Sequence, residues 1–222
     1  MSLKLIIFDL DGTLIDSSVD LTHAINYAIE PYGAPKVTVR ETIGLVGEGI
    51  SRLMEKVVEK ESIEADKALL IDRFLEHYSA HLVDNTVPYP GVPEMLAQLS
   101  DYRKAVISNK RESLSKVILE KLNLSVYLDL IMGSDSAGAK KPSPVPVFHV
   151  LSKLGISPEK AVIVGDSIYD IKAGKAAGIR TIAVTYGYRP AAELQEADFI
   201  INTVDELAKI LKKMGPGQKA KG

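Results

Sequence analysis

The chain has 222 residues, of which 46% are hydrophobic and 25% charged, and its formal net charge is −2. This composition is typical of a globular protein, and the balanced charge gives no indication of a nucleic-acid binder. Because the chain has no cysteine, disulfide scaffolds, cysteine zinc sites and thiol nucleophiles are excluded. Its first apolar run is too short for a signal peptide or a membrane span, so we expect a cytoplasmic protein without membrane partners.

Short apolar runs rich in Ile and Val predict strands that are buried on both faces. They span residues 3–8, 105–107, 130–132, 161–164, 181–184 and 199–201. Between them, helical spacing of apolar residues predicts helices over 92–99, 113–122, 145–154, 168–177 and 205–213. Strands that alternate with helices in this way predict an α/β fold with a doubly wound, parallel, Rossmann-like sheet.

One stretch interrupts the alternation. Between residues 17 and 86 we find helical spacing and no convincing strand, with three apolar stripes: Leu21, Ile25, Ala28 and Ile29; Leu53, Val57 and Val58; and Leu69, Leu70, Phe74 and Tyr78. We therefore expect an α/β core domain at 1–15 and 87–215, a small helical cap domain at 16–86, and a disordered tail at 216–222. The segments 16–18 and 87–91 contain residues typical of turns, and we expect them to act as hinges between the two domains.

The first predicted strand ends in two carboxylates, Asp9 and Asp11, which are followed by Gly12 and Thr13. In an open α/β sheet, ligands bind beyond the carboxyl ends of the strands, and residues i and i+2 of an extended segment point the same way. Two like charges that close need a cation or a shared proton. Gly12 lets the backbone turn sharply and approach a ligand. Taken alone, these residues also fit an Asp-Gly turn that simply ends a strand.

Two later loops carry groups suited to phosphate. Ser108 and Asn109 follow a predicted strand, where a hydroxyl and backbone N–H groups can bind phosphate oxygens, although in isolation they fit a helix cap equally well. Lys141 stands directly before Pro142, and a lysine held rigidly there can neutralise a phosphoryl group. A solvated pair of lysines, Lys140 and Lys141, is the alternative.

A second pair of carboxylates follows the strand predicted at 161–164. Asp166 lies at its end and Asp170 four residues later, so one helical turn brings both toward the same place. Hard carboxylate ligands, without cysteine or clustered histidine, favour Mg²⁺ over zinc or copper. The alternative is a helix cap with an acidic residue in the favourable first turn.

Together, these segments supply a nucleophile, a proton donor, a phosphate clamp, a counter-charge and a metal site, which acyl-phosphate chemistry requires. Their order and spacing resemble the haloacid dehalogenase-like hydrolase superfamily, with its Asp-x-Asp-x-Thr, Ser/Thr, Lys and Gly-Asp-x-x-x-Asp motifs. The resemblance covers essentially the whole chain, including a helical cap inserted just after the first motif.

The resemblance implies that Asp9 attacks phosphorus while Asp11 protonates the leaving oxygen and later activates water. It implies that Ser108 and Lys141 hold the phosphoryl group. Members that attack carbon lack an acid at the position of Asp11, and ion-pumping members usually carry Lys there, so a phosphatase or a phosphomutase remains.

The resemblance also implies the remaining binding groups. Phosphate binding would extend to Gly12, Thr13 and Asn109. Mg²⁺ would be bound by Asp9, the backbone carbonyl of Asp11 and Asp166, with Asp170 as a further ligand or as support behind them.

Substrate choice is expected to lie in the cap. Gly47, Glu48 and Gly49 form a Gly-x-Gly turn before a helix, which lets backbone lie close to a small ligand, although a plain loop fits equally well. With residues 89–92 and 185–188, this segment resembles phosphoglycolate phosphatases more than other members. His77 and His81 show no metal-ligand pattern, so we expect them to be structural or exposed.

We therefore expect a Mg²⁺-dependent phosphatase that acts on a small phosphorylated metabolite, with 2-phosphoglycolate as the best single candidate. A phosphomutase or a pyrophosphatase on the same scaffold is the alternative among enzymes. A non-catalytic binder is disfavoured, because buried carboxylates are costly to keep without a metal or a purpose. The sequence leaves open whether the protein is a monomer or a homodimer.

Overall fold

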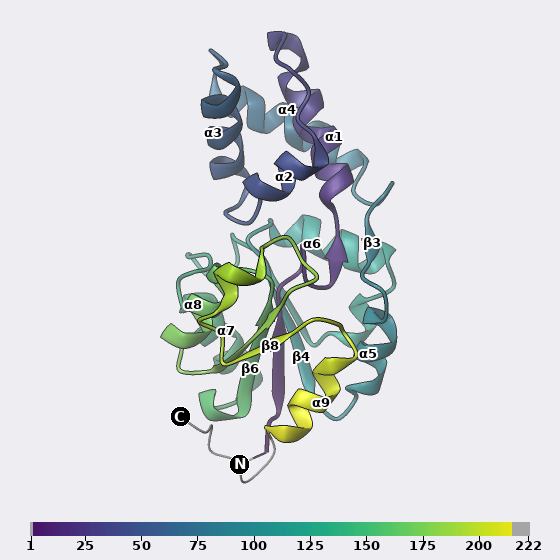
Figure 1. Cartoon of the computed structure of the whole chain (residues 1–222), viewed down its shortest axis with the longest axis vertical. Coiled ribbons are helices and arrows are strands. Elements are labelled where there is room, and N and C mark those ends of the chain that lie inside the picture. The colour runs from purple at the N-terminus through teal and green to yellow at the C-terminus, as the bar shows by residue number, and fades with distance from the viewer. Residues whose placement is uncertain (1, 215–222) are drawn as a thin grey trace.

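The structure is a computed structural model that describes residues 2–214 (Figure 1), so the tail expected at 216–222 lies outside the described residues. Its core is a parallel six-stranded sheet with the strand order β5-β4-β1-β6-β7-β8. The strands are β1 Leu5–Phe8, β4 Arg103–Ile107, β5 Leu130–Met132, β6 Ala161–Gly165, β7 Arg180–Val184 and β8 Phe199–Ile201. Each lies within about two residues of an expected strand, and the predicted doubly wound α/β fold is confirmed.

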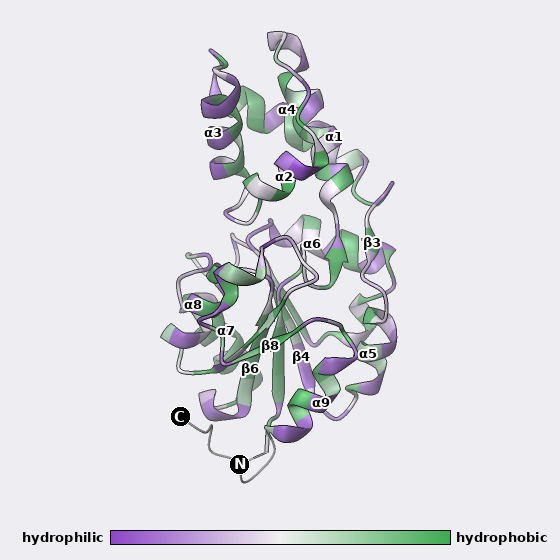
Figure 2. Ribbon diagram, in the orientation of Figure 1, coloured by the Kyte–Doolittle hydropathy of each residue, from purple (hydrophilic) through white to green (hydrophobic). Residues whose placement is uncertain are grey.

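Helices cover both faces of this sheet. Side chains alternate along β1, so that Ile6 and Phe8 pack with α5, α6 and α9 on one face, while Leu5 and Ile7 pack with α7 and α8 on the other. The bounds of these helices are α5 Val92–Gln98, α6 Glu112–Lys121, α7 Val145–Leu154, α8 Ile168–Ala176 and α9 Glu206–Lys213. Hydropathy colouring shows the apolar strands enclosed between helices with polar outer surfaces (Figure 2). Short 3-10 turns lie at Glu30–Tyr32, Ser125–Tyr127, Pro158–Lys160 and Ala191–Leu194.

The order of the strands fixes where a ligand can bind. From β1, the chain builds outward through β4 to β5 and then returns to the other side of β1 for β6, β7 and β8. The order therefore reverses at β1, between β4 and β6. In open α/β sheets this switch point opens a crevice at the carboxyl ends of the strands.

A group of helices stands above that crevice (Figure 1). It comprises α1 Ser18–Ile29, α2 Val39–Leu45, α3 Ile50–Glu61 and α4 Lys67–Ala80. The buried positions Leu70, Phe74 and Tyr78 recur every four residues along α4 and face the other helices of the group. This agrees with the helical spacing expected for residues 17–86, while the division into a core and a cap at 16 and 86 stays a prediction.

One detail of the expected helices was wrong and another was missing. Leu69 is 52% exposed and does not belong to the stripe of Leu70, because neighbouring helical residues point about 100° apart. Helix α2 lies within the stretch expected to be helical, but no apolar stripe was assigned to it. It begins at a capping box in which Thr38 and Glu41 bind each other's backbone N–H groups, a signal that the sequence does contain.

The two segments expected to be hinges lie side by side. Residues of β2 (Ile15–Asp16) pair antiparallel with β3 (Val87–Pro88), so the chain leaves and re-enters the sheet through a short two-stranded ribbon. Buried Asp20, at the start of α1, ties this crossing together by accepting hydrogen bonds from the backbone and side chains of Asn85 and Thr86. Among residues 2–214, no helix has both the length and the hydrophobicity that a membrane span requires.

Candidate active site

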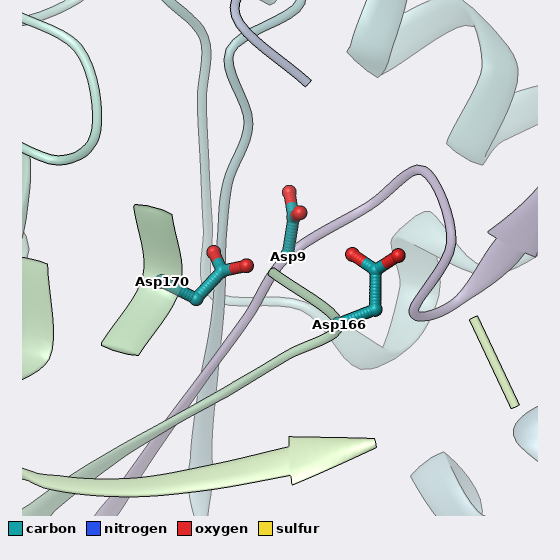
Figure 3. Close-up of side chains that lie close together, drawn as sticks. All are labelled: Asp9, Asp166 and Asp170. Carbon is teal, nitrogen blue, oxygen red and sulfur yellow. The ribbon is translucent and has the colours of Figure 1, made fainter. Parts of the chain in front are cut away.

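Three carboxylates meet at the switch point of the sheet. Asp9 follows β1 and Asp166 follows the neighbouring β6, while Asp170 lies in the first turn of α8. The backbone N–H of Asp9 donates to Val164 at 2.9 Å, so the strand pairing continues up to the carboxylate. One oxygen from each of the three residues lies within 4.8 Å of the others. Figure 3 shows the three side chains close together. The sequence predicted this convergence, for Asp9 and Asp166 from the strand ends and for Asp170 from its spacing of one helical turn after Asp166.

Gly12 makes room for this cluster. Its φ is +82°, a backbone conformation that residues other than glycine rarely adopt. A Cβ at this position would lie 2.3 Å from Oδ2 of Asp166. The glycine is therefore required both for the turn after β1 and for the close approach of Asp166.

Lys141 is the positive centre of the cluster. Its ammonium Nζ lies 2.7 Å from Oδ1 of Asp9 and 2.6 Å from Oδ1 of Asp170, and its side chain is 2% exposed. The second oxygen of Asp170 accepts from the backbone N–H and hydroxyl of Ser167. Asp170 is thus committed to orienting Lys141 and to capping α8. Both carboxylates raise the pKa of Lys141 even though its burial acts to lower it, so the side chain is charged.

Ser108 and Asn109 have different tasks. The side chain of Asn109 accepts from the backbone N–H of Lys141 and donates to its carbonyl, both at 3.0 Å, so it holds the loop that carries this lysine. Ser108 Oγ accepts from the backbone N–H of Lys110 at 3.1 Å, which leaves its own proton to serve a ligand oxygen.

Asp11 is surrounded by groups that the sequence analysis did not select. Its Oδ1 accepts from Ser17 Oγ at 2.5 Å and from Lys110 Nζ at 2.6 Å. Lys110 Nζ also donates to the hydroxyl of Tyr78 on α4, at 2.8 Å. Tyr188 joins the network from the loop after β7, since its hydroxyl accepts from the backbone N–H of Ser17. No spacing rule links positions so far apart in the chain. Lys110 lies in the predicted phosphate loop, Tyr188 in the segment 185–188 that carried the subgroup resemblance, and Ser17 in a predicted hinge, but nothing in the sequence placed them around Asp11.

The charges of the cluster do not balance within the protein. Asp9, Asp11, Asp166 and Asp170 face two lysines that contact them, Lys110 and Lys141, which leaves two negative charges when all four acids are ionised. Burial, and then repulsion from Asp170, raise the pKa of Asp9 to about 7 against the attraction of Lys141. Burial and the charge of Asp9 likewise raise the pKa of Asp166. This shortfall and the all-oxygen donor set fit a bound divalent cation of the Mg²⁺ type.

A cavity of about 350 Å³ opens above these carboxylates. The predicted residues that line it are Asp9, Asp11, Gly47, Gly49, Ser108, Asn109, Lys141 and Asp166. The others lie just outside this lining: Gly12, Thr13, Glu48 and Asp170. The buried Thr13 Oγ1 has no hydrogen-bond partner among the described residues. The side chain of Glu48 pairs with Lys56 at 2.5 Å, while its backbone carbonyl accepts from Lys140.

Comparison with known proteins places the chain in a family. A model of the haloacid dehalogenase-like hydrolases matches residues 6–184. The chain belongs to this family. It is 41% identical over 211 residues to the phosphoglycolate phosphatase of Aquifex aeolicus, covering 94% of this chain and 97% of that protein. It is 38% identical over 216 residues to the phosphoglycolate phosphatase of Chromobacterium violaceum, covering 95% and 97%.

Solved structures agree with this assignment. The crystal structure of a predicted phosphoglycolate phosphatase from Haemophilus somnus superposes with a TM-score of 0.89 at 30% identity, covering 95% of this chain and 98% of that one. The expected resemblance to the phosphoglycolate phosphatase-like subgroup is thereby confirmed, and so is the expectation of an enzyme of the phosphatase type. The roles of the individual residues stay predictions.

Proposed function

We propose that the protein hydrolyses a small phosphomonoester through an aspartyl-phosphate intermediate, with 2-phosphoglycolate as its substrate. The observation that carries this proposal is the placement of Asp9. It stands at the switch point of the sheet, at the floor of the cavity, with an ammonium group bound to one of its oxygens. The names of the relatives from Aquifex aeolicus and Chromobacterium violaceum support the choice of substrate.

Asp9 is the proposed nucleophile. Its Oδ1 accepts from the backbone N–H of Leu10 and from Lys141, both at 2.7 Å, which fixes the carboxylate and leaves Oδ2 to attack phosphorus. Lys141 and the hydroxyl of Ser108 neutralise and orient the phosphoryl oxygens. Asp11 then gives a proton to the leaving oxygen, and it later takes one from the water that cleaves the aspartyl phosphate.

The proposed cofactor is Mg²⁺, bound by Asp9, Asp166 and the backbone carbonyl of Asp11. When bound, it supplies positive charge that screens the carboxylates from one another and from the incoming phosphate. Asp170 is a support in this scheme, since both of its oxygens are engaged by Lys141 and Ser167. Asp166 is itself held by the backbone N–H of Tyr188 at 2.7 Å.

Residues 16–86 are proposed to act as a cap domain on a core of 1–15 and 87–215. Three core side chains bind cap backbone carbonyls: Asn109 binds Gly47, Lys140 binds Glu48, and Arg189 binds the end of α2. A cap held in this way above the cavity excludes water during attack on phosphorus.

The proposal is tested by phosphate release. Purified protein is incubated with Mg²⁺ and a panel of 2-phosphoglycolate, pyrophosphate and hexose phosphates, beside an EDTA-treated sample. We expect preferential release from 2-phosphoglycolate, silencing by EDTA and recovery with Mg²⁺. An isomerised sugar phosphate would instead indicate a phosphomutase, preference for pyrophosphate would indicate a pyrophosphatase, and activity that survives EDTA would overturn the metal-dependent scheme.

A further inference from the structure

Lys110 lies between the proposed catalytic acid and the helices above it. Its Nζ is 2.6 Å from Oδ1 of Asp11 and 2.8 Å from the hydroxyl of Tyr78, which α4 contributes. The lysine side chain is 8% exposed, Tyr78 is 1% exposed, and all three residues line the cavity. The scheme above assigns no task to this buried cation.

Within residues 2–214, two groups accept from the ammonium of Lys110, which leaves it one donor to spare. Burial acts to lower the pKa of this lysine, but the charges and hydrogen bonds of Asp11 and Tyr78 together outweigh burial and raise the pKa above its ordinary value, so the group is charged. An ammonium carries three N–H donors, and Asp11 and Tyr78 accept two of them. A charged donor that is held by two partners and largely removed from solvent binds an anion more strongly than a mobile surface lysine does.

The position of Asp11 determines which substrate atoms come close to Lys110. To protonate the leaving oxygen, Asp11 must be within hydrogen-bond reach of it. A group attached to the first carbon beyond that oxygen lies only two covalent bonds away, each about 1.5 Å long. Since Lys110 is 2.6 Å from Asp11, such a group falls within reach of its ammonium.

We infer that Lys110, oriented by the hydroxyl of Tyr78, binds the carboxylate of a 2-phospho-carboxylic acid and so selects this class of substrate. The inference rests on the proposed function and names the residue that gives it specificity. One spare donor suits a single carboxylate, whereas the second phosphoryl group of pyrophosphate carries more charge than this donor can satisfy. The cavity lining includes the apolar residues Leu21, Phe74, Leu75 and Leu114, which offer nothing to the hydroxyl groups of a sugar.

The other cations of the cavity are less suited to this task. Lys140 and Arg189 are engaged with backbone carbonyls of the helical segment. Arg111 also lines the cavity, but it is exposed to solvent, where water weakens its attraction for an anion. Arg111 is next to Lys110 in the chain and carries the same charge, so it provides a matched control.

The test compares two substrates that differ only in the carboxylate: 2-phosphoglycolate and 2-hydroxyethyl phosphate. We expect Lys110→Met to lower kcat/KM for 2-phosphoglycolate about 30-fold or more beyond its effect on 2-hydroxyethyl phosphate, as loss of one partner of a desolvated charge pair does. Lys110→Arg should recover part of this selectivity, and Tyr78→Phe should lose a smaller part of it. Arg111→Met should change both substrates by the same factor.

Several outcomes would overturn the inference. Equal losses on both substrates in Lys110→Met would mean that the lysine only orients Asp11, and a selective loss in Arg111→Met would move the subsite there. If wild-type protein hydrolyses other phosphomonoesters but does not prefer 2-phosphoglycolate, the inference fails while the phosphatase mechanism stands. If it hydrolyses none, the proposed function fails and the inference with it. Should Lys110→Met be inactive on both, calorimetric binding of the two esters to Asp9→Asn, with and without Lys110→Met, gives the same comparison without turnover.

Discussion

The strand-end site and the contacts to residues 43–48 above it are built in opposite ways. In the site, side chain binds side chain: Lys141 pairs with Asp9 and Asp170, and Lys110 pairs with Asp11. In the contacts to residues 43–48, core side chains bind backbone carbonyls. A substitution in the first set alters the charge of the site. A substitution at residues 43–48 leaves the backbone carbonyl in place, because every residue type has one. In the proposed mechanism, the chemistry therefore depends on charged side chains at the strand ends, and the placement of residues 43–48 depends on Asn109, Lys140 and Arg189.

Arg189 is the main donor of the second set. Its guanidinium donates to the carbonyls of Ile43 at 3.1 Å and Gly44 at 3.3 Å, and also to that of Val46. The last carbonyls of a helix lack intrahelical partners and carry partial negative charge, so a cation is stabilising there. Arg189, which follows β7, thus caps the end of α2.

The largest effect is expected from Asp9→Asn. Removing the nucleophile should lower kcat by roughly 10³-fold or more, as loss of a covalent nucleophile does in other hydrolases. The fold should persist, because the substitution removes one charge from a crowded cluster. Phosphate release and circular dichroism check both expectations, and substantial residual turnover would remove Asp9 from its role.

Arg189→Met comes second and tests the contacts to the helices. We expect kcat/KM to fall about 10-fold, because a misplaced α2 costs catalytic orientation. The melting temperature should fall by no more than about 4 °C, since a cation at a helix end contributes about 1 kcal/mol or less. Arg52→Met is the control, since the partners of this exposed arginine in the described part of the chain are Glu55 and Glu59, both in the helical segment. Unchanged kinetics in Arg189→Met would mean that closure does not depend on this arginine.

A third prediction concerns the metal-free protein. The pKa of Asp9 is about 7 in the folded state against an ordinary 3.8, so folding takes up a proton and stability must fall as the pH rises from about 4 to about 7. Metal-free wild type should therefore lose several °C of melting temperature relative to Asp9→Asn across this range, since about 1 kcal/mol shifts it by roughly 2–4 °C in a chain of this size. Mg²⁺ should reverse the loss at pH 8 in wild type. If the melting temperature of metal-free wild type instead rose relative to that of Asp9→Asn over this pH range, the charge balance described above would be contradicted.

The difference between the side-chain pairs of the site and the contacts to backbone carbonyls also explains which residues could be predicted from the sequence. Asp9 and Asp166 were predicted because both follow apolar strands, and parallel strands bring their carboxyl ends to one edge. Lys110 was passed over because its partners, Asp11 and Tyr78, lie 99 and 32 residues away along the chain and meet it only when the helices pack on the core. The contacts of Arg189 could not be predicted, because backbone carbonyls leave no mark in the sequence.

The smallest effect is expected from Glu48→Ala, in the predicted substrate loop. Its side chain pairs with Lys56 and does not line the cavity, whereas the carbonyl that Lys140 binds remains in the variant. We expect kcat/KM to change less than about 2-fold and the free energy of unfolding by no more than about 1 kcal/mol, as for other partly exposed ion pairs. Lys56→Ala removes the same ion pair but keeps the hydrogen bond between Glu48 and Tyr169, so the difference between the two variants measures that hydrogen bond. A loss above about 10-fold in Glu48→Ala alone would show that this side chain reaches the substrate, and the division between core side chains and cap backbone would then fail at this loop.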